Sequence, residues 1–346
     1  MKETQLNQET IFDWETQVTE DILSFMRKQM EHAYALGKTP RDFHSKGHSW
    51  VRAEFRVEAN IDKRFRHGLF KEPKTYQAWI RYSNASNGIR KDSARDVRGM
   101  AIKLFDVPGK KLVTEGDDHS TLDLLTFSAP KFLTRDSKQF LSFVRAILGS
   151  SKVAAFLFGL LNPGVIGSVL TSFKKTKSLL NIDYFSATPY ALGNNLAVKY
   201  VVTQKNQERT RIPRDPSQDF LLQNLQDYLD HKDATFDFNV QPQVNPQTEP
   251  IENGLKVWKS PYYKVATLYI PRQRVTTQNL VDLAENSAYN PWRTLEEHRP
   301  LGNINRVRKE IYKHVSEFRH MRNYTQIANP DPDSVPDDGA KTPKVV

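Results

Sequence analysis

Short stretches in which apolar and polar residues alternate dominate the chain from about residue 50 to residue 132. Residues 51–57, 77–82 and 99–105 each follow this pattern, and turns rich in Gly, Asn and Asp separate them. A period of two places alternate side chains on opposite faces of a β-strand. The stretches therefore predict antiparallel strands, each with a buried face.

Two further strands are predicted much later in the chain, at residues 196–203 and 263–270. The polar stretch between them, about 205–254, contains Pro and Gln and reads as a connection with a short helix at 221–229. The sheet is thus expected to assemble from segments that are distant in sequence.

Helical spacing of apolar residues predicts an amphipathic helix from residue 14 to about 38 and a last helix from about 305 to 323. The end of the chain is rich in Pro, Asp and Lys and has too little apolar content to fold. We therefore expect an N-terminal helical arm at 1–38, a globular domain at 39–326 and a disordered tail at 327–346.

Composition excludes several kinds of site. The chain of 346 residues has no cysteine, so disulfides, thiolate-bound metals and iron–sulfur clusters are excluded. Its net charge is +10, but Lys and Arg are scattered and no nucleic-acid-binding signature occurs, so no nucleic-acid partner is expected. Residues 1–14 lack the basic and apolar regions of a secretory signal, so we expect a cytoplasmic protein.

Residues 153–173 contain no charged side chain. The length approaches that of a membrane span, roughly 20 residues, but Asn162-Pro163-Gly164 interrupts the segment and favours two short apolar arms. The preferred interpretation is a buried helical hairpin. Peripheral contact with a membrane is the second interpretation, and a true span is the third.

The last helix carries an unusual combination of side chains. Arg308, Tyr312 and Arg319 are spaced i, i+4 and i+11, which at about 100° per residue returns them to within roughly 40° of one another. A phenol between two guanidiniums can be held as a phenolate. Tyrosinate is one of the few haem-iron ligands available to a chain without cysteine.

Two earlier segments also carry residues that could belong to a binding site. The predicted strands carry Arg81 and Arg98 at positions expected to be buried, where an unpaired charge is costly unless an anion meets it. A histidine, His44, lies just before the first strand, although eight other histidines compete with it as a site residue.

Together these segments resemble the haem catalases and the smaller catalase-like proteins related to them. The resemblance runs in order from about residue 40 to residue 323. The matching motifs are Arg41-x-x-His44-x-Lys46-Gly47, Arg81-Tyr82-Ser83, the highly specific Arg95-Asp-Val-Arg-Gly-Met-Ala-Ile-Lys-Leu-Phe105, and Arg308-x-x-x-Tyr312 followed by Arg319.

The resemblance implies an α+β fold: a catalase-like antiparallel β-barrel with surrounding helices, whose C-terminal helix lies on the proximal side of haem b. It also implies the site residues. His44 would be the distal acid–base residue, Ser83 the hydroxyl that orients it, and Tyr312 the iron ligand whose oxygen Arg308 keeps ionised. Arg41, Arg81 and Arg319 would bind the haem propionates, and Phe140 would stack on the porphyrin.

The chain departs from the catalase pattern at residues 123–130, where Phe127 stands at the position expected of the distal asparagine. Without that amide, a second hydrogen peroxide molecule is oriented poorly. We therefore expect a haem peroxidase that acts on hydrogen peroxide or organic hydroperoxides and has weak catalase activity. A lyase or isomerase of fatty-acid hydroperoxides and a non-enzymatic haem-binding protein remain alternatives. The chain is short for a catalase, so any homo-oligomer is expected to be smaller than the tight tetramer.

Overall fold

A closed antiparallel barrel forms the centre of the molecule in the computed structural model, which describes residues 5–114, 120–149, 151–206 and 210–328. Eight strands close the ring in the order β5-β4-β3-β2-β1-β9-β8-β7, and β5 pairs with β7. The strands of the ring are β1 (Lys46–Val57), β2 (Thr75–Asn84), β3 (Arg98–Leu104), β4 (Leu122–Phe127), β5 (Tyr184–Phe185), β7 (Leu196–Gln204), β8 (Ala234–Pro242) and β9 (Tyr263–Ile270). A short strand, β6 (Tyr190–Leu192), pairs with β7 outside the ring.

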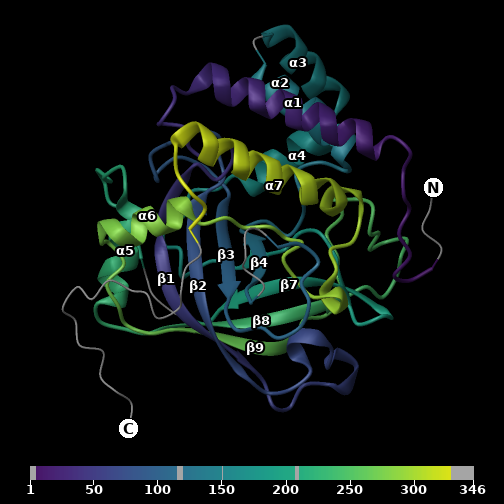
Figure 1. Ribbon diagram of the computed structural model, residues 1–346, viewed down its shortest axis with the longest axis vertical. Helices are drawn as coiled ribbons and strands as arrows, with labels where there is room; N and C mark the ends of the chain where they lie inside the picture. The colour runs from purple at the N-terminus through teal and green to yellow at the C-terminus, as the bar shows by residue number, and fades with distance from the viewer. Residues whose placement is uncertain (1–4, 115–119, 150, 207–209, 329–346) are drawn as a thin grey trace.

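Helices surround this barrel (Figure 1), as the expected α+β class requires. They are α1 (Glu15–Ala33), α2 (Ser137–Leu148), α3 (Lys152–Leu161), α4 (Pro163–Ser172), α5 (Phe220–Leu229), α6 (Gln278–Asn286) and α7 (Asn303–Asn323). Single 3-10 turns occur at η1 (Lys63–Phe65), η2 (Gly68–Phe70) and η3 (Glu296–His298).

The predicted alternation is confirmed on both faces of the strands. On β2, Ile80 and Tyr82 belong to the core inside the barrel, whereas Trp79 belongs to a separate cluster outside it. Phe55 and Phe238 meet across the interior with ring centroids 5.0 Å apart. Burying side chains of this size stabilises the fold by roughly 1.5–3 kcal/mol each.

Three strands, β5, β6 and β8, were not predicted from the sequence. β8 lies inside the polar stretch that the sequence assigns to a connection, while the short helix expected there is α5. Two polar residues of β8, Asn239 and Gln241, are buried, and their side-chain amides donate hydrogen bonds to backbone carbonyls. The strand also carries an alternating set of buried apolar residues, Ala234, Phe236, Phe238 and Val240, but the polar composition of the surrounding stretch outweighed this short pattern in the prediction.

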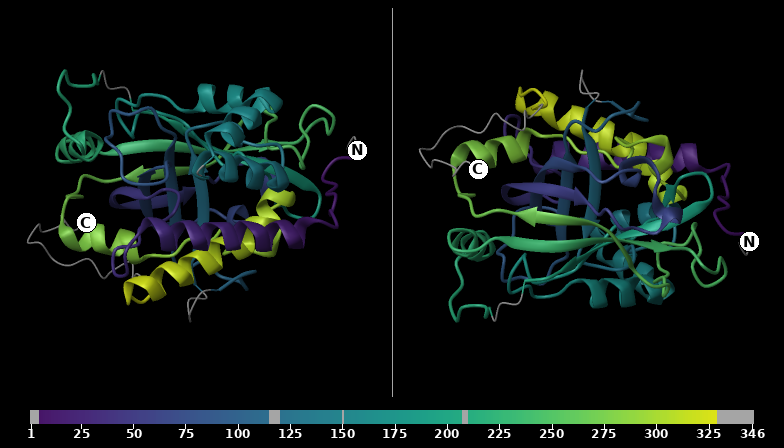
Figure 2. Two further views of the ribbon diagram at one scale, coloured as in Figure 1. Left: turned by 90° about the horizontal axis from the view of Figure 1, so that it is seen from above. Right: turned by 90° about the horizontal axis from the view of Figure 1, so that it is seen from below.

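The predicted terminal helices pack together. α1 and α7 run side by side along one side of the barrel (Figures 1 and 2), and α2 joins them. Their shared apolar cluster contains Val18, Ile22 and Met26 of α1, Leu141 of α2, and Val307 and Ile311 of α7. α6 covers a neighbouring part of the barrel, where Leu280 and Ala284 meet Trp50 and Trp79.

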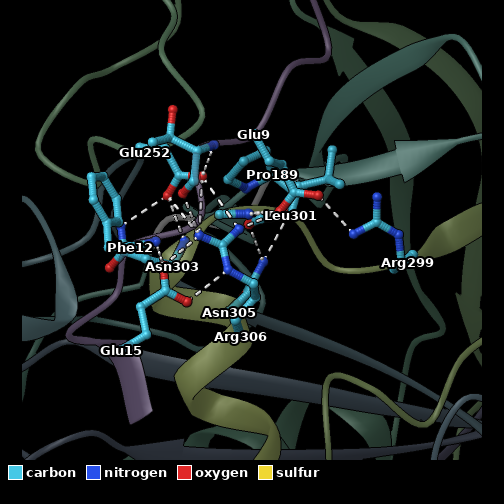
Figure 3. Close-up of polar contacts among 12 residues, drawn as sticks. Glu9, Phe12, Glu15, Pro189, Glu252, Arg299, Leu301, Asn303, Asn305 and Arg306 are labelled. Carbon is cyan, nitrogen blue, oxygen red and sulfur yellow. Dashed lines mark hydrogen bonds and ion pairs between the residues drawn. The ribbon is translucent and has the colours of Figure 1, made fainter. Parts of the chain in front are cut away.

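The first turn of α7 is fixed by Arg306 (Figure 3). Its guanidinium forms ion pairs with Glu9, with Glu15 at 2.7 Å and with Glu252 at 3.3 Å. Burial by itself lowers the pKa of Arg306, but the three carboxylates outweigh burial and raise it. This network ties the N-terminal segment and a distant loop to the helix that carries Tyr312.

Residues 153–173 form two arms, α3 and α4, as predicted, and the pair is bent by 98°. Within the described residues no single helix is long and apolar enough to cross a membrane, although this bent pair meets the length and composition criteria together. The expectation that the hairpin is buried is wrong, because α3 has no buried residue. Only one side of the hairpin packs on α2, and the other faces outward.

The expected tail at 327–346 falls almost entirely outside the described residues, which end at residue 328. The division of the preceding chain into an arm at 1–38 and a haem domain at 39–326 remains a prediction.

Candidate functional site

A row of four residues crosses the outer face of the barrel where β1 to β4 lie side by side. Gly47 pairs with Ser83, Ser83 with Gly99, and Gly99 with Phe127. Residues paired directly across strands point to the same face. The strand register therefore brings Phe127 to the same part of the surface as Ser83.

His44 lies over this row. Its Nδ1 atom is 2.9 Å from the Ser83 hydroxyl. When Nδ1 carries the hydrogen and donates it to Ser83, Nε2 is left as a proton acceptor.

Gly99 explains why a glycine stands in the most specific motif. A Cβ atom at this position would lie 2.6 Å from the His44 Nδ1 atom and 2.6 Å from the Ser83 hydroxyl oxygen. Real contacts of this kind are never so short, so the imidazole can rest against β3 only where the side chain is missing.

The backbone of His44 adopts an unusual conformation, with φ at +58°. Left-handed backbone is uncommon for residues other than glycine and recurs at functional sites. Two hydrogen bonds hold it: the His44 amide donates to the Ala85 carbonyl at 3.1 Å, and Arg81 Nη2 donates to the His44 carbonyl at 3.0 Å. The position of the imidazole is therefore fixed by neighbouring strand residues.

The imidazole is kept neutral. Burial, followed by the nearby positive charges of Arg81, Arg308 and Arg41, lowers the pKa of His44 to about 3. A neutral histidine at physiological pH is able to accept a proton. The influence of Arg308 also shows that α7 approaches the barrel at His44.

Three predicted arginines meet at one carboxylate. Arg41, Arg319 and Arg81 lie 2.9, 3.1 and 3.7 Å from the carboxylate of Glu285 on α6. Burial by itself raises the pKa of Glu285, but the surrounding guanidiniums outweigh burial and lower it. Glu285 could not be identified from the sequence, because nothing in α6 marks one glutamate as the partner of distant arginines.

The single carboxylate of Glu285 cannot neutralise three guanidiniums, so this arginine cluster keeps an excess of positive charge. Burial and the charge of Arg41 lower the pKa of Arg81 to about 10 and that of Arg319 to about 9. The Arg81 Nε atom is buried without a hydrogen-bond partner. A ligand bearing carboxylates, such as the propionates of haem, fits this excess charge and this free donor.

Arg98, the other strand arginine, needs no ligand. Its guanidinium donates to the backbone carbonyls of Asp92 and Ala94, both at 3.0 Å, and to the Thr176 hydroxyl at 3.1 Å. The expected anion is therefore required at Arg81 and not at Arg98.

The predicted pair on α7 is formed. Arg308 Nη2 donates to the Tyr312 hydroxyl at 3.0 Å, and Arg308 Nη1 donates to Asn305 at 3.0 Å. Burial by itself lowers the pKa of Arg308, but Tyr312 and Tyr190 outweigh burial and raise it. The guanidinium thus stays charged beside the phenol oxygen, as stabilisation of a tyrosinate ligand requires.

Four aromatic rings form a chain beside His44. Phe43 lies 6.3 Å from Phe140, Phe140 lies 5.8 Å from Phe132, and Phe132 lies 6.3 Å from Phe127. All four are half-buried. Phe140 thus lies near the distal segment, and Phe132 is a member of this aromatic chain that the sequence did not single out.

Within the described residues, no cluster of His, Asp and Glu side chains is arranged to hold a metal ion. The donor groups that are present instead fit haem: a phenol beside a guanidinium on α7, an excess of buried arginine charge, aromatic rings, and a neutral histidine.

Part of the sequence and the fold as a whole resemble known proteins. The sequence profile of the family described as Catalase matches residues 14–153. No curated protein matches the chain.

Solved structures of catalases share the fold. Catalase A from Saccharomyces cerevisiae matches with a TM-score of 0.67 and 17% identity, over 99% of this chain and 76% of that one. A bacterial catalase matches with a TM-score of 0.64 and 16% identity, over 96% and 66%. A fungal catalase matches with a TM-score of 0.63 and 16% identity, over 99% and 73%. The chain thus spans about two thirds to three quarters of the length of these catalases.

Proposed function

Because the Catalase profile matches residues 14–153 and the chain shares the fold of solved catalases, we propose that it is a small catalase-like protein and a haem-dependent peroxidase acting on hydrogen peroxide or organic hydroperoxides. The observation that carries the proposal is the neutral His44 held against Ser83 and Gly99, together with the Arg308–Tyr312 pair on α7. Storage or transport of haem gives no reason for a strained, neutral histidine at this position.

Tyr312 would hold the iron from α7, and Arg308 would keep its oxygen ionised. Arg41, Arg81 and Arg319 would bind the propionates. Phe140 would lie against the porphyrin. Haem b, when bound, supplies the redox chemistry that cleaves the O–O bond.

His44 performs the proton transfer. Its Nε2 atom accepts the proton of the peroxide oxygen that binds first and returns it to the oxygen that leaves, which is general acid–base catalysis. Ser83 fixes the tautomer through Nδ1. The lowered pKa keeps the imidazole unprotonated at neutral pH, so that Nε2 is free to accept that proton.

The presence of Phe127 supports the expectation that catalase activity is weak. It occupies the row of Ser83 and Gly99, and its ring has no hydrogen-bond donor to orient a second hydrogen peroxide. The aromatic chain from Phe43 to Phe127 instead favours an organic hydroperoxide with an apolar tail.

That aromatic chain also supports a second candidate, a lyase or isomerase of fatty-acid hydroperoxides. Such an enzyme converts its substrate without an added reductant, whereas a peroxidase requires an electron donor.

Absorption spectroscopy of the purified, haem-reconstituted protein tests the proposal. We expect a Soret band that changes in Tyr312→Phe and not in the control Tyr324→Phe, since Tyr324 is 78% exposed beyond α7. Hydrogen peroxide and then a fatty-acid hydroperoxide are added, each with and without a reductant.

Loss of His44 should slow the reaction with peroxide by about 10²–10⁴-fold, with the exposed His231→Ala as control. Unchanged reactivity in His44→Ala would favour a non-enzymatic haem-binding protein. Absence of a Soret band after reconstitution would overturn the proposal altogether. Cytoplasmic residence and a small homo-oligomer remain predictions; sedimentation velocity measures the latter.

A further inference from the structure

The outward side of the α3–α4 hairpin is unusually apolar. Five large apolar side chains of α3 are at least half exposed: Val153 at 68%, Phe156 at 66%, Leu157 at 50%, Leu160 at 63% and Leu161 at 79%. Leu170 of α4 is 66% exposed. We call these six residues the apolar hairpin face. Contiguous apolar exposure of this kind marks an interaction site.

The segment that contains this face carries charges of one sign. No Asp or Glu occurs from residue 137 to residue 182. Over the same range the chain carries exposed lysines: Lys152 at the start of α3, Lys174, Lys175 and Lys177 shortly after α4, and Lys138 in the first turn of α2. Arg145, the remaining cation of the range, pairs with Asp21 at 3.1 Å. An apolar surface flanked by exposed lysines is complementary to an anionic lipid surface.

The geometry suits insertion at the interface. Lys152 begins α3, whereas Leu160 and Leu161 end it, so the cations lie at the base and the leucines at the tip. Ten helical residues span about 15 Å, and an interfacial helix buries its apolar face roughly 5–10 Å deep. Figure 1 shows α3 at the upper edge of the molecule, away from β9.

The opposite side of the hairpin continues towards the candidate site. Phe158 and Val169 pack in one cluster with Phe43 and Phe140, and the rings of Phe158 and Phe143 lie 6.1 Å apart. The same hairpin therefore contacts the aromatic chain beside His44 on one side and presents the apolar hairpin face on the other.

We propose that the apolar hairpin face docks on an anionic phospholipid bilayer. The leucine tip enters the interface while the lysines at the base contact the headgroups. This inference stands on exposure and charge, goes beyond the proposed function, and does not depend on haem. It supplies a reason for an apolar site, since lipid hydroperoxides reside in bilayers.

Cosedimentation with vesicles tests the proposal. The full chain is mixed with vesicles of phosphatidylcholine alone or of phosphatidylcholine with phosphatidylglycerol. We expect binding to the anionic vesicles, at least about tenfold tighter than to the neutral ones, and weakening in high salt.

Two variants, each with a control, test whether the leucines and lysines of the hairpin contact the vesicles. Leu161→Glu should weaken binding roughly tenfold or more, since it removes a leucine that would enter the bilayer and adds a charge that anionic headgroups repel. Its control is Val244→Glu, because Val244 is also exposed, at 59%, but lies outside the hairpin. Lys174→Glu with Lys175→Glu should weaken binding by a similar factor, whereas the control pair, Lys63→Glu with Lys71→Glu, reverses two exposed charges elsewhere.

Equal binding to both vesicle types, binding that survives Leu161→Glu, or no binding would each overturn the proposal. A dimer that Leu161→Glu converts to a monomer, without any vesicle binding, would assign the face to a second copy of this chain instead. The Soret band is recorded for the same samples. Normal haem loading without vesicle binding would therefore contradict this inference alone, and vesicle binding without haem would contradict only the proposed function.

Discussion

The two faces of β2 and β3 carry different kinds of side chain and have different roles. On the inner face, Ile80, Tyr82, Met100 and Ile102 belong to one continuous apolar core. On the outer face, Arg81, Ser83 and Gly99 position His44. Arg81 also belongs to the arginine cluster around Glu285. Adjacent residues of one strand thus serve stability and chemistry separately.

The outer face carries features that destabilise a fold. Arg81 has a buried nitrogen without a partner, and His44 has a left-handed backbone. Features of this kind cost of order 1–3 kcal/mol each and persist where the surrounding structure holds them. The inner core offsets that cost, which is why the chemical face can deviate from ordinary packing rules.

The largest expected effect comes from the inner face. Phe238 is fully buried and contacts Phe55 and Tyr200, so Phe238→Ala should lower the free energy of unfolding by about 3–5 kcal/mol. Urea unfolding measures this loss. Phe127→Ala on the outer face should cost clearly less, because Phe127 is only half-buried. Equal losses in the two variants would remove the distinction between the faces.

Gly99→Ala, on the outer face, should lower peroxide reactivity more than it lowers stability. The added methyl group meets His44 and Ser83, so stability should fall by about 1–3 kcal/mol while peroxide reactivity falls about a hundredfold through misplacement of the imidazole. Stopped-flow kinetics and thermal unfolding measure the two effects. Gly167→Ala is the matched control, because nothing lies within 4 Å of its added carbon. Full activity in Gly99→Ala would show that the close approach is not needed.

Acid should destabilise the protein through His44. Burial lowers its pKa in the folded state to about 3, below the unfolded value of 6.5. The resulting stabilisation is therefore complete above pH 6.5 and is lost as the pH falls from 6.5 towards 3, at up to about 1.4 kcal/mol per pH unit. Unfolding between pH 7.5 and 5 should show a shallower slope in His44→Gln.

His298 provides a comparison for that slope. It packs beside the inner core, where it contacts Phe70 and Tyr200, and burial lowers its pKa to about 3 as well. Its contribution should remain in His44→Gln, so part of the acid dependence should persist. An unchanged slope in His44→Gln would mean that the imidazole is not buried in its neutral form.

Ser83→Ala should have the smallest effect. It removes one hydrogen bond, worth about 1 kcal/mol, so we expect a loss of roughly fivefold in peroxide reactivity and a normal Soret band. Ser142→Ala, an exposed serine on α2, serves as the control. A larger loss than that of His44→Ala would contradict the positioning role of Ser83.

Local patterns account for what the sequence by itself determined. The two-residue alternation of residues 77–82 and 99–105 depends only on strand geometry, and the Arg308–Tyr312 spacing depends only on helix geometry. Both predictions therefore hold in the structure without reference to the rest of the chain. The motifs around His44 and Gly99 could also be identified from sequence, although the reason for the glycine could not.

Only the tertiary structure decided how distant segments meet. Pairing of β5 with β7 closes the barrel, strand register places Phe127 in the row of Ser83, and Glu285 reaches three arginines from separate elements. The exposure of α3 likewise depends on which of its sides finds a neighbour. No local pattern encodes these contacts, because each is fixed by the packing of segments far apart in the chain.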